Sequence, residues 1–505
     1  MNHRSTGVFA ILTLSAGLAA ASPQVASIHY DALAGTTAEI PMPANKRAPF
    51  GWPVFALDRS PVLLTATGAS GEGDLFLRLT VAVDDRELRR IEVRVAGSGE
   101  AVGQLDVRFA YPLQTFQLAV PAQFRDGVKT RGMSLHQIGH VKPLWLFAAA
   151  PTGATPIEFQ PHLFTVSGPV DRIAALHQRL VSVASVQPFG WIEGCVLEGL
   201  QANLARDQPA VTAARAAHWR LFSPSPGQLR YENHNSEPFD GRIHTIEGGL
   251  PFADLVRHDP GNPLVNAFLA FTVEFTQPGG AIQDPAAPSA LTAEGSYTIA
   301  YPLALIAVAR RDPGLAAIAH RQLVLRRDRL WHEGAIWLRH YQGNDTRTFR
   351  GWSRGIAWYA LGLVRTIEVL RPQRDVSELE AELRRVAAWV LPLQRPDGLW
   401  PCFLEEAQVS PDTSGSSGIA TALAAGARLG ILSPSARDAA RRTLAASIPH
   451  ITPDGLLDGV AQSNRGGEAL QRGDYRVLSL FGSGLLAQLV AECAAVPPPP
   501  TTTAP

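Results

Sequence analysis

Residues Asp397-Gly398-Leu399-Trp400 form a short loop between two segments with helical periodicity, Val376 to Leu393 and Ile419 to Leu432. Both segments repeat apolar residues at helical spacing, and both are rich in alanine and leucine. A glycine in the turn between two such segments is typical of a helical hairpin. This stretch therefore predicts two packed antiparallel helices.

The same glycine-centred loop recurs along the chain, with its turn glycines 53, 54, 64 and 57 residues apart. Repetition at this interval indicates a stack of helical hairpins. Five loops, plus a helix pair formed by the two ends of the region, predict a closed (α/α)6 barrel. An open solenoid, which normally carries polar capping repeats, is the alternative. The other four loops are Pro226-Gly227-Gln228-Leu229, Gly279-Gly280-Ala281-Ile282, Glu333-Gly334-Ala335-Ile336 and Asp454-Gly455-Leu456-Leu457; the remaining candidate helices are Ile173 to Val183, Leu264 to Phe275, Ile299 to Ala309, Ile356 to Leu370, Ser435 to Ile448 and Val477 to Cys493.

A different pattern precedes the helices. Apolar and polar residues alternate in several segments between Ser22 and about Pro169, with Gly, Asp and Pro between them. Alternation with period two indicates half-buried strands. We predict an antiparallel β-sandwich-like domain, with carbohydrate binding and structural support both open as its role. The segments are Leu75 to Val81, Arg90 to Val95, Gln104 to Phe109, Phe116 to Val120 and Leu144 to Phe147.

The two termini differ from both regions. Met1 to Arg4 carry positive charge, Gly7 to Ala20 are almost wholly apolar, and small residues follow. This order is typical of a secretory signal and predicts an exported protein, periplasmic or secreted. The predicted division is a signal peptide at 1–21, a β-rich accessory domain at 22–169, an (α/α)6 barrel catalytic domain at 170–496 and a disordered Pro/Thr tail at 497–505.

The composition limits the classes of partner. The chain has 505 residues, and its 45 basic and 45 acidic residues give no net charge. Nucleic acids and anionic membranes are therefore not expected partners of the mature protein. Cys195, Cys402 and Cys493 lack the spacing of a zinc site and are expected to be packing residues, with one disulfide possible. The oligomeric state stays open.

Two matched acidic motifs stand one hairpin apart. Glu247-Gly248 and Glu294-Gly295 are separated by 47 residues, and each precedes a segment with a proline. The spacing predicts that both carboxyl groups lie on the same rim of the barrel. Glycoside cleavage needs such a pair, one protonated to donate and one ionised to activate water or stabilise positive charge. The alternative is two helix-start glutamates favoured by the helix dipole.

Several other residues are candidates for substrate binding. Trp191 lies in a loop, Phe189 to Gly194, that precedes a helix, and it offers an aromatic surface; His234, His244 and Tyr297 lie close in sequence to the two glutamates. Their presence beside the acidic pair favours the catalytic interpretation.

The stretch Phe349 to Tyr359 contains Trp352, Arg354 and Trp358. Arg354 and Trp358 are four residues apart and share a helix face. A guanidinium can hold a carboxylate bidentately, and an indole can support a sugar ring. A structural cation–π pair is the alternative.

Asp412-Thr413-Ser414-Gly415-Ser416-Ser417-Gly418 runs directly into a helix. Its hydroxyl groups, with Ser414 and Ser416 as the candidates, suggest an anion or hydroxyl site at a helix N-terminus. A plain N-terminal cap and a solvated loop are the alternatives.

Three stretches together resemble the unsaturated uronyl hydrolases of glycoside hydrolase families 88 and 105. They are Arg350 to Leu363, Gln394 to Trp400 and Asp412 to Leu432, and the ending from Tyr475 to Ala491 is similar as well. The resemblance implies an (α/α)6 barrel, no metal or organic cofactor, and release of a terminal unsaturated uronic acid from oligosaccharides. It also implies that Arg354 and Trp358 hold the uronate, with Ser414 and Ser416 nearby.

The chain departs from this family at the catalytic positions. The family uses two aspartates, each before a helix proline. Here Glu247 stands before Pro251, whereas Ser296 stands before Pro302 with Glu294 two residues earlier. Either Glu294 has taken the acid role or the chemistry has shifted. Related six-hairpin β-glucuronidases, which cleave saturated glucuronides through two glutamates, are also similar.

The expected function is a glycoside hydrolase that releases a terminal uronic acid, saturated or 4,5-unsaturated, from an oligosaccharide with an acidic sugar. A polysaccharide lyase is one alternative, with Tyr297, His234 or His244 as its base. A non-catalytic carbohydrate-binding protein is another.

Overall fold

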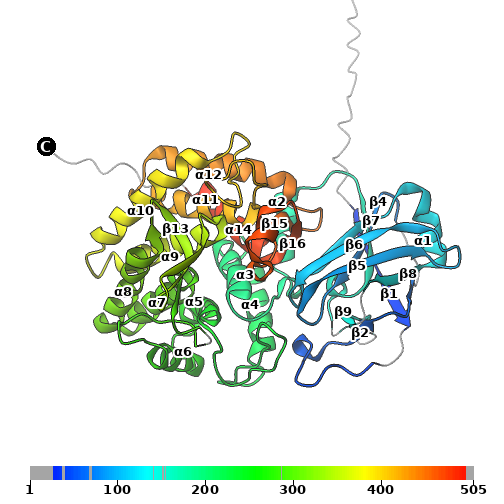
Figure 1. Cartoon of the computed structure of the whole chain (residues 1–505), viewed down its shortest axis with the longest axis horizontal. Helices are drawn as coiled ribbons and strands as arrows, with labels where there is room; N and C mark the ends of the chain where they lie inside the picture. Colours follow the sequence, from blue (N-terminus) through cyan, green and yellow to red (C-terminus); the bar gives the residue numbers. More distant parts are fainter. Residues whose placement is uncertain are drawn as a thin grey trace, which may run out of the picture.

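The computed structural model describes residues 27–36, 40–66, 71–139, 142–150, 153, 155–285 and 287–495. They form a β-rich N-terminal region and a helical C-terminal region, as the sequence predicts (Figure 1). The last strand of the first region ends at Ser167, and the first helix of the second begins at Arg172. The predicted signal peptide and the Pro/Thr tail lie outside the described residues.

The N-terminal region is built on an antiparallel sheet, eight strands within the described residues, in the order β6-β5-β8-β3-β1-β10-β4-β7. Buried and exposed side chains alternate along its strands. In β5, for example, Ile91 and Val93 are buried, whereas the polar residues next to them are exposed or half-buried. This is the period-two pattern of the sequence. The strands are β1 (Ser27–Thr36), β3 (Val62–Ala66), β4 (Asp74–Thr80), β5 (Asp85–Val95), β6 (Ala101–Ala110), β7 (Thr115–Ala119), β8 (Met133–Ile138) and β10 (His162–Ser167).

The sheet folds over on itself. Residues 27–32 of β1 pair with β10, whereas residues 33–36 pair with β3, so this strand belongs to both halves. The end strands β6 and β7 also contact each other. The pair β2 (Val54–Leu57) and β9 (Leu144–Phe147) and the short helix α1 (Arg125–Arg131) complete the region. A continuous apolar core lies between the halves.

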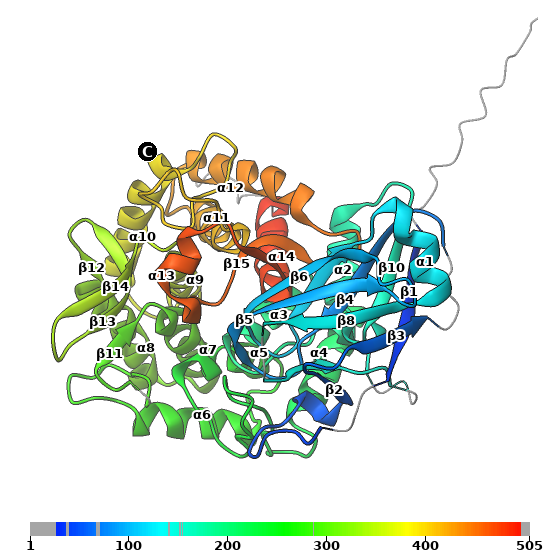
Figure 2. The same cartoon turned by 45° about the vertical axis from the view of Figure 1, so that its right-hand side comes forward.

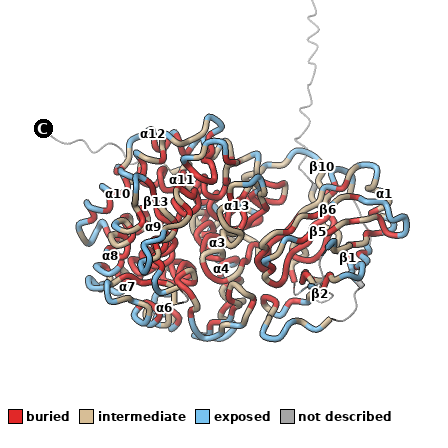
Figure 3. The backbone as a smooth tube through the Cα atoms, viewed as in Figure 1, coloured by how far each residue is buried: buried red, intermediate tan, exposed pale blue. Residues whose placement is uncertain are grey.

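The helical region contains a closed inner ring. Six helices of the described chain contact one another in the order α3, α5, α7, α9, α11 and α14, and α14 returns to α3. Helices α9 and α11 are buried along most of their length because neighbours cover them on several sides (Figure 3). The ring consists of α3 (Trp191–Ala202), α5 (Pro251–His258), α7 (Tyr301–Arg310), α9 (Ser353–Leu370), α11 (Thr413–Arg428) and α14 (Leu480–Ala494).

Outer helices pack against this ring, each on at least one inner helix. None of the helices in the described ranges is long and apolar enough to cross a membrane. Every candidate helix named from the sequence is observed, although α3, α4, α5 and α8 were not delimited there. The outer helices are α2 (Arg172–Leu180), α4 (Gln208–Phe222), α6 (Pro263–Glu274), α8 (Pro313–Leu330), α10 (Ser377–Val390) and α12 (Pro434–Ser447).

The predicted turn glycines are confirmed. Gly227, Gly280, Gly334, Gly398 and Gly455 have φ angles between 74° and 91°, a range that favours glycine. Each follows an outer helix and precedes the next inner helix. The connecting loops therefore gather at one rim of the ring.

Strands inside the helical region were not expected. A small antiparallel sheet joins β11 (Ala290–Thr292), β12 (Trp331–His332), β13 (Ala335–Tyr341) and β14 (Thr346–Arg350). A second pair, β15 (Leu457–Ala461) and β16 (Arg476–Ser479), encloses α13 (Gly467–Arg472). This C-terminal segment lies between the ring and the N-terminal sheet (Figure 2).

Polar contacts fasten the two regions together. The buried guanidinium of Arg78 in β4 donates to both carboxylate oxygens of Asp454, with Nη2 2.8 Å from Oδ1. Tyr475 donates its hydroxyl to the Asp106 carbonyl at 2.8 Å and accepts from the Arg108 amide at 3.2 Å. The three cysteines are free thiols, which fits their expected packing role and leaves the disulfide unformed.

Candidate active site

A cavity that is partly open to solvent lies where the rim loops lead into the inner helices. Both predicted catalytic residues line it. Five of the predicted binding residues line it too, namely Trp191, His234, Trp352, Arg354 and Trp358. The lining residues not expected from the sequence are Tyr111, Pro112, Pro188, Phe189, Ile192, Glu232, Asn233, Arg339, Ser463, Asn464, Arg465 and Phe481.

Backbone geometry brings the two acidic motifs together. Glu247 lies in the 3₁₀ turn Ile246–Gly249, which opens α5, and Glu294 precedes the π-helical turn Ser296–Ala300, which opens α7. The two turns contact each other. A Cβ at Gly249 would lie 2.0 Å from the carbonyl oxygen of Thr298, so only glycine permits this approach. Pro302 cannot donate a backbone hydrogen bond to that carbonyl four residues earlier, which favours the wider π turn.

Glu247 is held in its ionised form. Its Oε2 lies 3.0 Å from Nε2 of His234, and 24% of its side chain remains exposed. Burial acts to raise the pKa of Glu247, but His234, Arg465 and Arg339 together outweigh it and lower the pKa to about 2. At neutral pH this group is a carboxylate.

Glu294 is pushed in the opposite direction. The residue is 5% exposed, and its Oε2 has no hydrogen-bond partner among the described residues. Burial raises the pKa of Glu294 above its ordinary value, the negative charge of Glu247 adds to this, and Arg339 opposes it. Two neighbouring carboxyl groups with pKa values driven apart are typical of an acid and a base in one active site. The predicted division of roles therefore has a physical basis.

Arg339 is the cation that faces both glutamates. It lies on β13, where its Cα is paired with Thr292 of β11, and the Ala293 amide donates to the Leu338 carbonyl at 2.9 Å. No acidic side chain in the described ranges forms an ion pair with it, and its guanidinium lies 5.5 Å from the Phe349 ring. No alternation of apolar and polar residues marks this strand in the sequence, because Ala335 to Leu338 are all apolar; buried and half-buried side chains alternate only in the structure.

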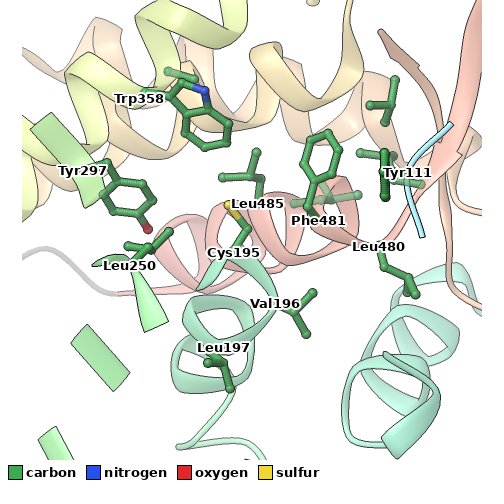
Figure 4. Packing of buried hydrophobic residues seen from close by; sticks show 14 of the residues in the cluster. Tyr111, Cys195, Val196, Leu197, Leu250, Tyr297, Trp358, Leu480, Phe481 and Leu485 are labelled. Carbon is green, nitrogen blue, oxygen red and sulfur yellow. The ribbon is translucent and has the colours of Figure 1, made fainter. Parts of the chain in front are cut away.

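Aromatic side chains form much of the remaining wall. The ring of Trp191 meets Trp358 edge-on at 5.1 Å and Phe481 at 4.8 Å. Phe481 lies between this group and Tyr111 of the β6–β7 connection (Figure 4). Such rings offer flat apolar surfaces to a sugar. The N-terminal region thus contributes directly to the cavity.

The structure does not support the expectation that Arg354 holds a substrate carboxylate. It lines the cavity, but its Nη1 and Nη2 donate to the carbonyls of Ala461 and Gln462 at 2.8 and 2.6 Å. Its guanidinium also lies over the Trp352 ring, 4.8 Å from the centroid. The cation–π alternative paired Arg354 with Trp358, whereas the structure places the guanidinium over the rings of Trp352 and Phe481. Two of its nitrogens already bind the end of β15, which makes it a poor open clamp for a uronate.

Ser414 and Ser416 are buried and do not line the cavity. The Ser414 hydroxyl donates to Asp412 at 2.7 Å, and Ser416 Oγ accepts from the Trp400 amide at 2.9 Å. Because the Ala461 amide also donates to Asp412, β15 covers this helix start. The expected anion site is therefore not formed: Asp412 caps the helix by accepting from the Ser414 amide, and the two serine hydroxyls bind Asp412 and Trp400.

Tyr297 and His244 also lie outside the cavity lining. Tyr297 is fully buried, stacked 6.2 Å from Trp358, and its hydroxyl donates to Gln488 at 3.3 Å (Figure 4). The His244 ring packs 4.4 Å from Phe239 and 6.2 Å from His234. Tyr297 is a core residue because the π turn directs it inward, and His244 supports the loop of His234. In the described ranges, no cluster of three or more His, Cys, Asp or Glu side chains has the arrangement of a metal site.

Part of the chain is similar to a known family. Residues 311–496 match the model of Glycosyl Hydrolase Family 88. The chain is 33% identical over 102 residues to Protein Atu3128 of Agrobacterium fabrum, and equally to the 24.9 kDa protein in picA locus of Rhizobium radiobacter. Each alignment spans 19% of this chain, which thus covers only 44% of the length of either relative.

Solved structures share the fold. A possible member of the GH105 family from Salmonella enterica is 15% identical, with a TM-score of 0.55 over 68% of this chain and 98% of its own. A possible GH105 member from Klebsiella pneumoniae is 14% identical, with a TM-score of 0.56 over 68% of this chain and 98% of its own. The family 105 glycoside hydrolase of C. acetobutylicum is 18% identical, with a TM-score of 0.55 over 64% of this chain and 98% of its own. The resemblance to families 88 and 105 seen in the sequence is confirmed, and at these identities the structural likeness concerns the fold alone.

Proposed function

We propose that this chain, whose C-terminal part matches glycoside hydrolase family 88, is a glycoside hydrolase that releases a terminal uronic acid from an oligosaccharide. One observation carries the proposal. Glu247 and Glu294 line a single cavity, and their surroundings drive their pKa values apart, Glu247 downward and Glu294 upward. We take the closed helical ring to be an (α/α)6 barrel and the folded-over sheet to be a β-sandwich-like accessory domain.

Glu294 is the proton donor in this proposal. Its pKa is raised above the ordinary glutamate value, which favours the protonated acid, and the carboxyl group borders the cavity. On a saturated uronide it protonates the glycosidic oxygen as the bond to the anomeric carbon breaks. On a 4,5-unsaturated uronide it protonates C4, and water adds at C5. The hydrated product then opens to release the sugar.

Glu247 is the ionised partner. Its Oε2 is engaged by His234, and its partly exposed side chain leaves the carboxylate accessible from the cavity. A carboxylate in this position accepts a proton from the attacking water or stabilises positive charge on the sugar ring. Both reactions above need this second group.

Arg339 makes the cavity selective for an acidic sugar. Its side chain lines the cavity and has no acidic partner among the described residues, whereas Arg465, which also lines the cavity, is paired with Asp84. A substrate carboxylate would supply the missing partner, and a guanidinium binds a carboxylate with two parallel hydrogen bonds. We therefore assign to Arg339 the uronate contact that the sequence suggested for Arg354.

The lyase alternative is weaker because its candidate bases are occupied or remote. Tyr297 is buried behind Trp358, His244 is outside the lining, and His234 is ion-paired with Glu247. A purely binding protein would not need two carboxyl groups with opposed pKa shifts.

A single assay separates these functions. Purified protein is incubated with saturated and unsaturated uronate oligosaccharides while the ultraviolet absorbance of the conjugated C4=C5 bond and the released sugars are followed. Falling absorbance with release of the terminal sugar identifies an unsaturated-uronide hydrolase. Release of uronic acid without an absorbance change identifies a saturated glycosidase. Rising absorbance, or no released uronic acid from any substrate, would contradict the proposal.

A further inference from the structure

We propose that the N-terminal β-rich region is a working part of the active site, in which Asp84 is a positioning residue that acts through Arg465 and His234 on Glu247. The inference rests on the proposed function. It gives a role to a region whose contribution the sequence left open.

The first observation is a polar chain from the β region to the catalytic carboxylate. Asp84 lies between β4 and β5, and only 7% of its side chain is exposed. Nη1 of Arg465 donates to Oδ1 of Asp84 at 2.6 Å and to the backbone carbonyl of His234 at 2.8 Å. The His234 ring then pairs with Glu247 at 3.0 Å. Each link is within hydrogen-bond distance.

The second observation concerns the loop that carries His234. The Asp84 amide donates to Ser236 Oγ at 2.8 Å, and the Arg47 amide donates to the Ser236 carbonyl at 2.8 Å. The Arg47 guanidinium also donates to the Tyr231 carbonyl at 2.8 Å. Residues of the N-terminal region therefore hold this loop on both sides of His234, in addition to the bridge between Glu232 and Pro238 within the loop itself.

These contacts define what Asp84 does. The charged and titratable groups that face Glu247 are His234, Arg465, Arg339 and His244, together with Glu294, which opposes a second negative charge. The Asp84 carboxylate holds Arg465, which donates in turn to the His234 carbonyl. Without the carboxylate this donor is no longer fixed, whereas the bond from the Asp84 amide to Ser236 remains.

Removing Asp84 has two opposite consequences for Glu247. Loss of a negative charge by itself lowers the pKa of Glu247, whereas displacement of His234 and Arg465 raises that pKa. The contact of His234 with Glu247, at about 3 Å, affects the pKa of Glu247 more strongly than the more distant charge of Asp84 does, because Coulomb energy falls with distance. We therefore expect the second consequence to dominate.

The test compares two neighbouring carboxylates in the full-length protein. Asp84→Asn is expected to lower kcat about tenfold, a modest part of the usual acid–base contribution, with KM changed less than twofold. The acidic limb of its pH profile should move to higher pH. Asp85→Asn is the matched control, because Asp85 is similarly buried and pairs with Arg89 at 2.7 Å inside the β region. It should lose thermal stability to a similar degree and keep the wild-type kcat and profile.

A double variant tests whether Asp84 acts on Glu247 through Arg465. If Asp84 acts through Arg465, then Asp84→Asn combined with Arg465→Gln should have the kcat of Arg465→Gln alone. Additive losses would overturn the inference. So would an Asp84→Asn enzyme indistinguishable from Asp85→Asn, or an acidic limb that stays in place or moves to lower pH.

A crystal structure of Asp84→Asn keeps the inference testable apart from activity. We expect Arg465 and the His234 loop to be displaced from Glu247, and unchanged positions would refute the positioning role. Wild-type protein that releases no uronic acid would instead refute the proposed function, so the two failures are distinguishable.

Discussion

Thr292 and Arg339 are direct partners across the antiparallel strands β11 and β13. Since Glu294 follows Thr292 by two residues, this register brings a cation from one hairpin beside a carboxyl group from the previous one. The strand pair thus places the proposed proton donor, just after β11, near the group that opposes its pKa rise. In the proposed function, acid catalysis and selectivity for an acidic sugar both depend on this sheet.

Replacing either glutamate by its amide should abolish most turnover. Glu294→Gln removes the proton donor and Glu247→Gln removes the base, so each is expected to lower kcat by ~10²-fold or more, the usual scale of lost general acid–base catalysis. Steady-state kinetics on uronate oligosaccharides measure this. Glu333→Gln, an exposed glutamate on a turn outside the cavity lining, is the control and should keep full activity.

The pH dependence of catalysis should reflect the two opposed shifts. Because the pKa of Glu247 is lowered to about 2, activity should persist as the pH falls below the ordinary glutamate value of 4.5. Because the pKa of Glu294 is raised, activity should disappear only as the pH rises through that raised value. A profile of kcat/KM against pH that declines on the acidic side at an ordinary carboxyl pKa would contradict the assignment.

The same shifts affect stability with opposite signs. The depressed pKa of Glu247 gives stability that is present above 4.5 and is lost as the pH falls toward about 2. The raised pKa of Glu294 gives stability that is present below 4.5 and is lost as the pH rises through the folded-state value. Glu294→Gln, which cannot ionise, should therefore have a higher Tm than the wild type at alkaline pH.

Arg339→Gln should weaken binding of acidic sugars selectively. Loss of a charge-assisted contact with a substrate carboxylate is expected to raise KM about tenfold or more for uronides, since such bonds contribute roughly 1.5–3 kcal/mol. The basic limb of the pH profile should also move upward, because Arg339 opposes the raised pKa of Glu294. Arg347→Gln, on β14 and paired with Asp345 at 3.0 Å outside the cavity lining, is the matched control.

Gly249→Ala should separate the two acidic turns. The added Cβ would lie 2.0 Å from the Thr298 carbonyl oxygen, so one turn must move. We expect kcat to fall at least tenfold, since misplacement of catalytic groups by about 1 Å can cost ~10²-fold. Gly343→Ala, where the Cβ would meet nothing within 4 Å, should be neutral. Equal kcat in both variants would show that the contact of the turns does not set the geometry.

The sequence was most informative where a single periodicity governs a long segment. Inner helices such as α9 repeat apolar residues over many turns, and the turn glycines adopt backbone angles that other residues avoid. The pairing of Glu247 with Glu294 also followed from the repeat, because equivalent positions in adjacent hairpins meet on one rim. In each of these cases the sequence pattern is local and repeats at a regular spacing.

The remaining part of the site depends on contacts between distant segments. Ser414 and Ser416 looked like an exposed polar loop, yet β15, more than forty residues later, covers them. Arg339 required knowledge of a strand pairing within a helical region, and Asp84 required the packing of two regions. Neither position carries a motif by which its neighbours could be inferred.

The ion pair between Arg78 and Asp454 has a consequence for the integrity of the whole molecule. It is shielded from water and joins a strand of the first region to the last hairpin loop of the second. Separating the two parts would expose to water the apolar core residues that the two regions share. We expect the two parts to melt together in one calorimetric transition, and the helical part expressed alone to aggregate.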